Sequence, residues 1–269
     1  MEISKVLFIS QEITPYLPES EMATIGREIP QGIQEKHGVE VRTFMPKYGF
    51  INERRNQLHE VIRLSGMNVI IDDSDHPLVI KVATLLPTRM QVYFIYNDDY
   101  FAPSLTKELE TIESPEDNDE RIIFFVRGVI ETVRKLRWAP AVIQCSGWID
   151  AIAPMYMRLN YNDDPSICDA KIILGLFDED LPAPLGKDFA KKLMFDGIKT
   201  PEVKALVDKN ATYIDLLKLG LPYCDGVIKY AKKVKPEVLA LVKESGKPFV
   251  DVADSDNMVE DVFNFYQSF

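Results

Sequence analysis

The chain opens with a short apolar run that sets the pattern of its first 50 residues. Lys5–Ser10 carries four consecutive apolar residues and ends at polar and proline residues, which is typical of a strand buried on both faces. A helical pattern runs from Ser20 to Lys36, and a second apolar strand is expected at Val39–Met45. This βαβ order predicts a right-handed crossover, with a ligand cleft at the carboxyl ends of the strands. The loop Gln11–Met22 is therefore expected to form a wall of that cleft.

Short apolar strips interrupt this pattern after the second strand. Val61–Leu64, Met67–Ile71 and Leu78–Ala83 are separated by Gly-, Asp- and Pro-containing turns, which predicts a small antiparallel insertion. Further strands are expected at Gln91–Tyr96, Ala141–Cys145, Lys171–Leu176, Gly226–Ile228 and Pro248–Val252.

Helical spacing of apolar residues recurs between these strands. The longest such helix is capped by Asp117 or Asn118 and has basic residues in its last turn, where they complement the helix dipole. Other helices are expected at Gly147–Asn160, Phe189–Leu193, Pro201–Leu219, Pro236–Lys243 and Asn257–Phe269. The pattern predicts one α/β domain over residues 1–269, with a mainly parallel, Rossmann-like sheet, Lys5–Ser10 as a central strand, and helices on both faces.

Composition narrows the classes of partner. The net charge of −11 argues against nucleic acid or an anionic membrane as the main binding partner. No signal peptide is expected, and no apolar run reaches about 20 residues, the length that a membrane span needs. The three cysteines are expected to be reduced, so a cytoplasmic protein is predicted. There is no Gly-rich dinucleotide loop or Walker motif, so no cofactor is expected.

Five separated segments, in order, carry a family resemblance. The chain resembles the N-terminal half of bacterial glycogen/starch synthases, which are ADP-glucose glucosyltransferases of the two-domain GT-B fold. The segments are KVLFIS-QEITPY at the start, VYFIYNDDYF at Val92–Phe101, DNDERIIFF at Asp117–Phe125, VIQCSGW at Val142–Trp148 and LLKLGLPYCDGVI at Leu216–Ile228.

The resemblance implies half of a glycosyltransferase. This half would contribute acceptor contacts and part of the donor-phosphate site, while a second Rossmann-like half holds most of the nucleotide sugar. No second half is expected within this sequence. The segment Asp256–Phe269 could correspond to the terminal helix that packs back on the N-terminal domain in the two-domain fold.

The family's first site motif is replaced. Where the family has a lysine followed by Thr-Gly-Gly-Leu, this chain has Pro18, Glu19, Ser20, Glu21 and Met22. The lysine and glycines of the family motif would bind a phosphate at the start of the helix. The two glutamates of this chain, Glu19 and Glu21, would repel a phosphate there. A carboxylate about 5 Å from a phosphate costs roughly 3 kcal/mol at an effective dielectric of about 20, or about a hundredfold in affinity.

Two further motifs have lost their histidines. The family's His-Asp-Trp-His corresponds to Ser146, Gly147, Trp148 and Ile149, and an isoleucine can neither donate nor accept a proton. The family's Thr-Ile-His-Asn aligns with residues 175–178, where phenylalanine stands in the histidine position. The catalytic residues are therefore unknown, although the fold resemblance remains.

Several residues are candidates for lining a ligand cleft, and each of them also has a purely structural interpretation. Trp148 could stack on a sugar ring or serve packing, and Glu12 could bind a sugar hydroxyl or remain solvated. Asp150 and Asp178 could line the rim or act as dipole partners. Because all follow predicted parallel strands, Glu12, Glu19, Ser146, Trp148 and Asp178 are expected to converge on one concavity.

The sequence gives little support to a metal site or a nucleophile. His76, within Asp72–His76, lacks the ligand order of a calcium loop and has no second histidine nearby, so an acidic turn is favoured and no metal is expected. Cys145 ends a strand without a histidine in its motif, which favours a buried thiol.

Three functions stay open. The chain could be an inert relative in glycogen metabolism that binds α-glucan or nucleotide sugar. It could be an active glucosyltransferase half that needs a partner glycosyltransferase chain. It could also be an interaction or regulatory protein on the same scaffold, without a sugar ligand.

Overall fold

The first strand occupies the middle of the main sheet. The structure, a computed structural model, describes residues 3–102 and 117–269. Strand β1 (Lys5–Ser10) pairs in parallel with β2 (Glu40–Pro46) on one side and with β7 (Val142–Ser146) on the other. The sheet order is β10-β9-β8-β7-β1-β2-β6-β5-β3, so the prediction of a central first strand is confirmed.

Most other pairings are parallel as well. Beyond β2 lies β6 (Met90–Tyr96), and beyond β7 lie β8 (Lys171–Leu176), β9 (Gly226–Lys229) and β10 (Phe249–Asp251). The parallel strands end along one edge of the sheet, which is where their loops can gather ligand groups.

The antiparallel insertion forms the far end of the sheet. Strand β5 (Ser74–Leu85) pairs with β6, while β4 (Met67–Ile71) and β3 (His59–Glu60) pair with β5. The expected strand at Val61–Leu64 is wrong. These residues form a turn in which the Leu64 amide donates to the Val61 carbonyl at 2.8 Å, and this turn separates β3 from β4, which pair with different parts of β5.

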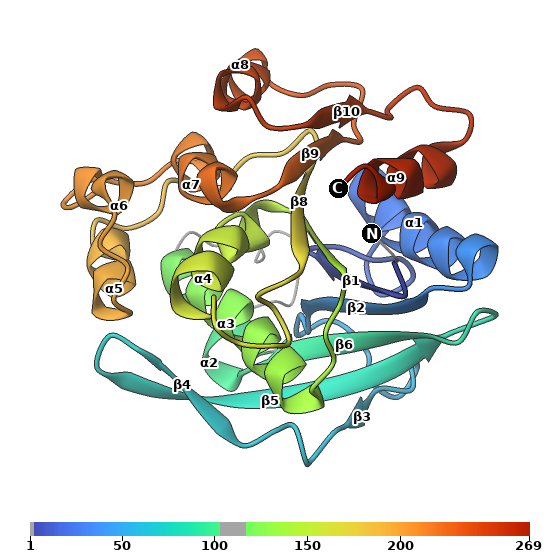
Figure 1. The fold of residues 1–269 in the computed structure, drawn as a ribbon. Helices are drawn as coiled ribbons and strands as arrows, with labels where there is room; N and C mark the ends of the chain where they lie inside the picture. The colour runs from blue at the N-terminus through green and yellow to red at the C-terminus, as the bar shows by residue number, and fades with distance from the viewer. Residues whose placement is uncertain (1–2, 103–116) are drawn as a thin grey trace.

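Helices cover both faces of the sheet. Figure 1 shows α3 (Asn118–Leu136) and α4 (Ala153–Asn160) on one side of the parallel strands, with α1 (Glu21–His37) and α9 (Met258–Gln267) on the other. The shorter helices are α2 (Asp98–Phe101), η2 (Trp148–Asp150), α5 (Phe189–Phe195), α6 (Pro201–Ala205), α7 (Tyr213–Gly220), η3 (Leu221–Tyr223) and α8 (Pro236–Ser245).

Helix α1 begins and ends where its sequence signals predict. The Ser20 hydroxyl accepts a hydrogen bond from the Ala23 amide at 2.9 Å, which caps the first turn. Gly38 closes the helix with φ of 65°, a left-handed conformation that glycine adopts without strain. Pro30 lies inside, yet the helix continues through it over its 17 residues.

Two expected helices are each broken into two. The segment Gly147–Asn160 forms η2 and then α4, because Pro154 lacks an amide proton and fits best in the first turn of a helix. The segment Pro201–Leu219 forms α6 and α7. Asp208 between them has φ of 60°, and Thr212 with Asp215 forms a capping box that starts α7.

The last helix packs on the first. A Cβ on Gly32 would lie 2.6 Å from Val259 Cγ2, so α1 and α9 approach closely. The His37 ring stacks on Phe263 with ring centroids 3.7 Å apart. The expected terminal helix thus exists as α9 and packs back on the domain. Within residues 3–102 and 117–269, no helix has the length and apolar character that a membrane crossing requires.

Candidate functional site

The loops after β1 and β7 are in direct contact. The Gln11 amide donates to the Ser146 carbonyl at 3.0 Å. Gly147 has φ of 132°, and a Cβ there would lie 2.6 Å from Gln11 Cβ. Only glycine fits such a backbone against its neighbour. The structure therefore brings the first loop and the Trp148 turn together at the carboxyl ends of two adjacent parallel strands.

Glu12 ties the first loop to the start of α1. Its carboxylate accepts a hydrogen bond from the Ser20 hydroxyl at 2.5 Å, and its carbonyl accepts one from the Ser10 hydroxyl at 2.9 Å. A Cβ on Gly26 would lie 2.4 Å from that carbonyl, so α1 presses on the loop. The Glu12 side chain keeps part of its surface exposed, which leaves lone pairs for a ligand.

Glu179, which the sequence reasoning missed, is a titratable group that connects three elements of the site. Its carboxylate accepts hydrogen bonds from the Trp148 amide at 2.9 Å and from the Tyr213 hydroxyl at 2.8 Å. Burial raises the pKa of Glu179 to about 7, the two hydrogen bonds oppose that rise, and the charges of Glu12 and Asp180 add to it. This carboxyl group joins the loop after β8 to η2 and α7.

Asp150 is fully buried rather than placed at a rim. One carboxyl oxygen, Oδ2, accepts a hydrogen bond from the Ser146 amide at 3.0 Å. The other, Oδ1, has no partner in the described part of the chain. Burial, with a smaller contribution from Glu179, raises the pKa of Asp150 well above its usual value. The group therefore favours its neutral form and stabilises the turn after β7.

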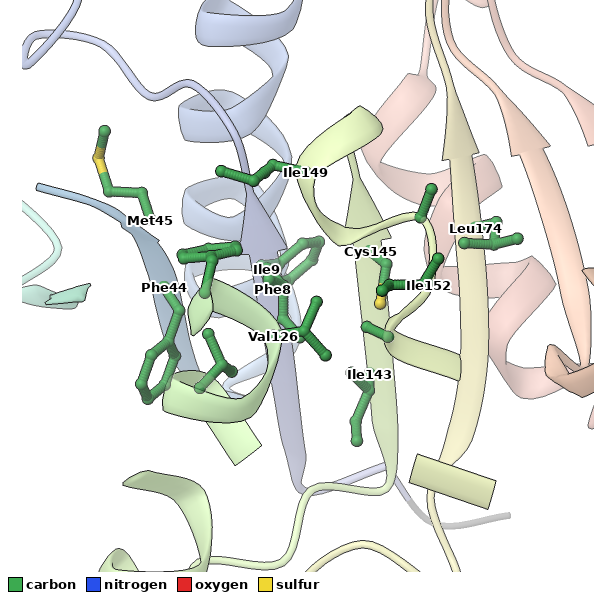
Figure 2. Packing of buried hydrophobic residues seen from close by; sticks show 14 of the residues in the cluster. Phe8, Ile9, Phe44, Met45, Val126, Ile143, Cys145, Ile149, Ile152 and Leu174 are labelled. Carbon is green, nitrogen blue, oxygen red and sulfur yellow. The ribbon is translucent and has the colours of Figure 1, made fainter. Parts of the chain in front are cut away.

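The two residues between Gly147 and Asp150 point into the core. Trp148 is 4% exposed and Ile149 is 0% exposed. Figure 2 shows Ile149 in the same apolar cluster as Ile9 and Cys145. The packing interpretation of the indole is therefore the one that this geometry supports, because a buried ring offers no face to a sugar.

A family model described as the starch synthase catalytic domain matches residues 5–246. The chain belongs to this family. A glycogen synthase of Chlorobaculum parvum is 32% identical over 235 residues, which cover 86% of this chain and 47% of the relative. A glycogen synthase of Chlorobium phaeovibrioides is 30% identical over 252 residues, which cover 91% and 48%. The chain spans about half the length of the curated relatives it matches.

A solved structure supports the same fold. The catalytic domain of Starch Synthase IV from Arabidopsis thaliana, bound to ADP and acarbose, superposes with a TM-score of 0.72. The sequence identity is 15%, and the match covers 93% of this chain and 51% of that chain. The expected Rossmann-like half of a GT-B fold is thereby confirmed.

The replaced family positions differ in their surroundings. Pro18 and Glu19 are exposed beside the start of α1, and Asp178 is exposed after β8. Within residues 3–102 and 117–269, no hydrogen bond or ion pair joins Glu19 or Asp178 to the Trp148 turn. Of the expected set, Ser146 and Trp148 belong to the turn that contacts Gln11, and Glu12 is the next residue of that loop. Their role in a ligand cleft stays a prediction.

Ser146, at the first histidine position of the starch synthase motif, belongs to a buried polar network. Its hydroxyl accepts a hydrogen bond from Gln144 Nε2 at 3.2 Å, and Gln144 Oε1 accepts from the Tyr230 hydroxyl at 2.8 Å and from the Tyr266 hydroxyl. A Cβ on Gly175 would lie 2.7 Å from the Ser146 hydroxyl. The network fills the space behind the turn and links β7 to α9.

His76 also has a structural role. Its Nδ1 lies 2.9 Å from an Asp99 carboxylate oxygen, and its Nε2 lies 3.0 Å from the Tyr100 hydroxyl. Both ring nitrogens are thus engaged within the antiparallel end of the sheet. In the described ranges, no group of three or more His, Cys, Asp or Glu side chains could hold a metal ion.

Proposed function

We propose that this chain is a non-catalytic member of the starch synthase family that binds α-glucan. The observation that carries the proposal is Ile149. It stands where the family motif has a histidine, and its side chain is completely buried in the core. A buried alkyl group can neither transfer a proton nor touch a reacting sugar. No rotation of this side chain restores the lost function, because the space around it is filled by packed residues.

The charge of the site disfavours a diphosphate. Pro18 replaces the family lysine, and Glu19 and Glu21 stand beside it at the start of α1. Glu12 and Glu179 add carboxylates at the neighbouring loops. Transferases stabilise the charge that develops on the leaving phosphate with cations and hydrogen-bond donors, and acceptors dominate here. A nucleotide sugar is therefore the weaker of the two candidate ligands.

The same acceptors suit a neutral sugar chain. Glu12 retains exposed surface and can accept hydrogen bonds from sugar hydroxyls without the penalty of facing a phosphate. The Starch Synthase IV structure, solved with ADP and acarbose, supports the placement of a ligand site on this fold. For the present chain we propose a carbohydrate ligand and not a nucleotide ligand.

A second candidate is an active half that a partner chain completes. It is favoured by one observation, which is that residues 5–246 match the starch synthase catalytic domain. A partner could supply a nucleotide site. It could not replace Ile149, however, because that position lies inside the core of this chain.

Calorimetric titration tests the proposal. The purified chain is titrated with maltoheptaose, ADP-glucose and UDP-glucose. We expect maltoheptaose to bind and both nucleotide sugars to bind the cleft at least tenfold more weakly. In Glu12→Gln the maltoheptaose affinity should fall by about tenfold, the scale of a hydrogen bond to a charged acceptor. The control Glu244→Gln makes the same change on the exposed face of α8 and should leave it unchanged.

Tighter cleft binding of ADP-glucose than of maltoheptaose would contradict the proposal and favour the transferase half. Absence of maltoheptaose binding at millimolar concentration would instead favour an interaction protein without a sugar ligand.

A further inference from the structure

A groove lies between α8 and the edge strand β10, formed by different residues from those of the glucan site. Its volume is about 570 Å³, within the range of small-molecule sites. Figure 1 shows α8 and β10 together at the end of the sheet opposite β3. The lining residues are Lys229, Lys232, Leu239, Val242, Lys243, Gly246, Lys247, Phe249 and Asp251.

The groove is basic in a strongly acidic chain. Four lysines and one aspartate line it, whereas the whole chain carries a net charge of −11. Residues 229–247 contain six lysines and two glutamates. A concentration of one charge sign around a concave surface attracts a ligand of the opposite sign.

Two of the four lysines, Lys243 and Lys247, make no ion pair in the described part of the chain. The Lys247 ammonium donates to two backbone carbonyls, at 2.6 and 3.0 Å. Lys243 is exposed and has no hydrogen-bond or ion-pair partner among the described residues. The other two lysines pair with aspartates, Lys229 with Asp251 at 2.8 Å and Lys232 with Asp254 at 2.6 Å. Asp254 is 80% exposed and lies outside the lining, so its surface ion pair is weak enough for a phosphate to replace it.

The floor of the groove is apolar. Leu239 and Val242 line it from α8, and Phe249 contributes from β10. Phe249 is 44% exposed, one of the few large apolar side chains of the described residues left at the surface. An aromatic face beside ammonium groups suits a ligand that has a flat ring at one end and negative charge at the other.

The starch synthase family match does not cover this feature fully. The match ends at residue 246, and Lys247, Phe249 and Asp251 lie beyond it. The groove therefore depends on β10, a strand outside the matched domain.

We propose that the groove binds a nucleoside polyphosphate. The ammonium groups of Lys232, Lys243 and Lys247 hold the phosphates, and the base packs on Phe249 above the apolar floor. Four lysines against one lining aspartate match the charge of a triphosphate. The lining residues of the groove differ from those of the glucan site, and the charge of Glu21 at the start of α1 acts on Lys232.

The test uses ATP, tripolyphosphate and adenosine as calorimetric probes of the full chain. ATP is expected to bind, tripolyphosphate to bind more weakly, and adenosine not to bind at millimolar concentration. Lys232→Gln combined with Lys243→Gln should weaken ATP binding by up to about 25-fold, since each surface ion pair contributes up to about fivefold. Both side chains are exposed, so the variant should fold.

Matched variants isolate the two halves of the site. Lys187→Gln with Lys209→Gln removes the same charge at exposed positions outside the groove and should leave ATP binding unchanged. Phe249→Ala should weaken ATP binding and leave tripolyphosphate binding as it was.

Undiminished ATP binding in the variant of Lys232 and Lys243, or adenosine binding as tightly as ATP, would overturn the proposal. Maltoheptaose titration of the same variant keeps the two sites distinguishable, because loss of glucan binding affects only the proposed function.

Discussion

Replacing Glu179 with glutamine should make the stability of the protein less dependent on pH. The pKa of this carboxyl group is about 7 in the folded chain against a reference value of 4.5. The folded state therefore binds the proton more tightly than the unfolded state. The resulting stabilisation is fully present below pH 4.5 and is lost as pH rises through 7.

The size of the effect depends on the pKa difference between the two states. One pKa unit corresponds to about 1.36 kcal/mol, so the rise to about 7 implies a loss of about 3 kcal/mol between pH 4.5 and pH 8. This figure is an upper bound, because the residue keeps some exposed surface and solvent screens part of the charge. In Glu179→Gln the titrating group is absent, so this loss disappears.

Urea denaturation at pH 5, 6, 7 and 8 measures the effect. The free energy of unfolding of Glu179→Gln minus that of the parent should rise with pH by about 2–3 kcal/mol. The difference in free energy of unfolding at pH 5 reports the altered hydrogen bonds to Trp148 and Tyr213. This contribution does not affect the slope of the difference against pH. Glu244→Gln on exposed α8 should show a flat difference. A flat difference for Glu179→Gln as well would refute the claim that this carboxyl group is held in a buried, anionic environment.

Three further substitutions, one of them with a glycine control, test the packing around the site. Gly220→Ala should lower the stability of the fold by about 3 kcal/mol or more, because its Cβ would lie 2.0 Å from the Ala151 carbonyl oxygen. In the control Gly246→Ala the Cβ meets open space at φ of 65°, so the loss should be only about 1 kcal/mol. Equal losses of stability in thermal unfolding would contradict this prediction. Ile149→His should destabilise by about 2–4 kcal/mol, by burying an imidazole among apolar groups, without producing glucose transfer; measurable transfer by a folded variant would show that the position is not sealed in the core. Tyr266→Phe should lower the free energy of unfolding by about 1 kcal/mol, because it removes one hydrogen bond to buried Gln144. An unchanged midpoint in urea denaturation would show that this hydrogen bond does not stabilise the fold.

The predicted strands succeeded where the apolar pattern alone decides structure. Lys171–Leu176 was predicted with the bounds that β8 has, because a short run rich in β-branched residues has the length of a strand buried on both faces. Val61–Leu64 failed for the opposite reason. Its apolar residues match a strand locally, but β5 pairs instead with the two residues before them, His59 and Glu60, and the tertiary partner decides.

The site could be predicted only in part. The motif comparison found that Ile149 and Pro18 replace functional residues, and that inference needs no coordinates. Glu179 was missed because its partners, Trp148 and Tyr213, are 31 and 34 residues away in sequence. The one signal available was its position just beyond a buried parallel strand, and Asp178 shares that signal. Burial separates the two carboxylates, and burial comes from packing rather than from local sequence.

The most direct measurement is the incorporation of labelled glucose from ADP-glucose into glycogen by the purified chain. No incorporation above a reaction without enzyme is expected, because Pro18 and Ile149 replace two groups of the mechanism, each typically worth about a hundredfold to a thousandfold in rate. Trp148→Ala serves as a control for contaminating synthase, since activity from a contaminant would persist in that preparation. Robust transfer by the parent chain that disappears in the variant would show that other residues of this domain perform the reaction.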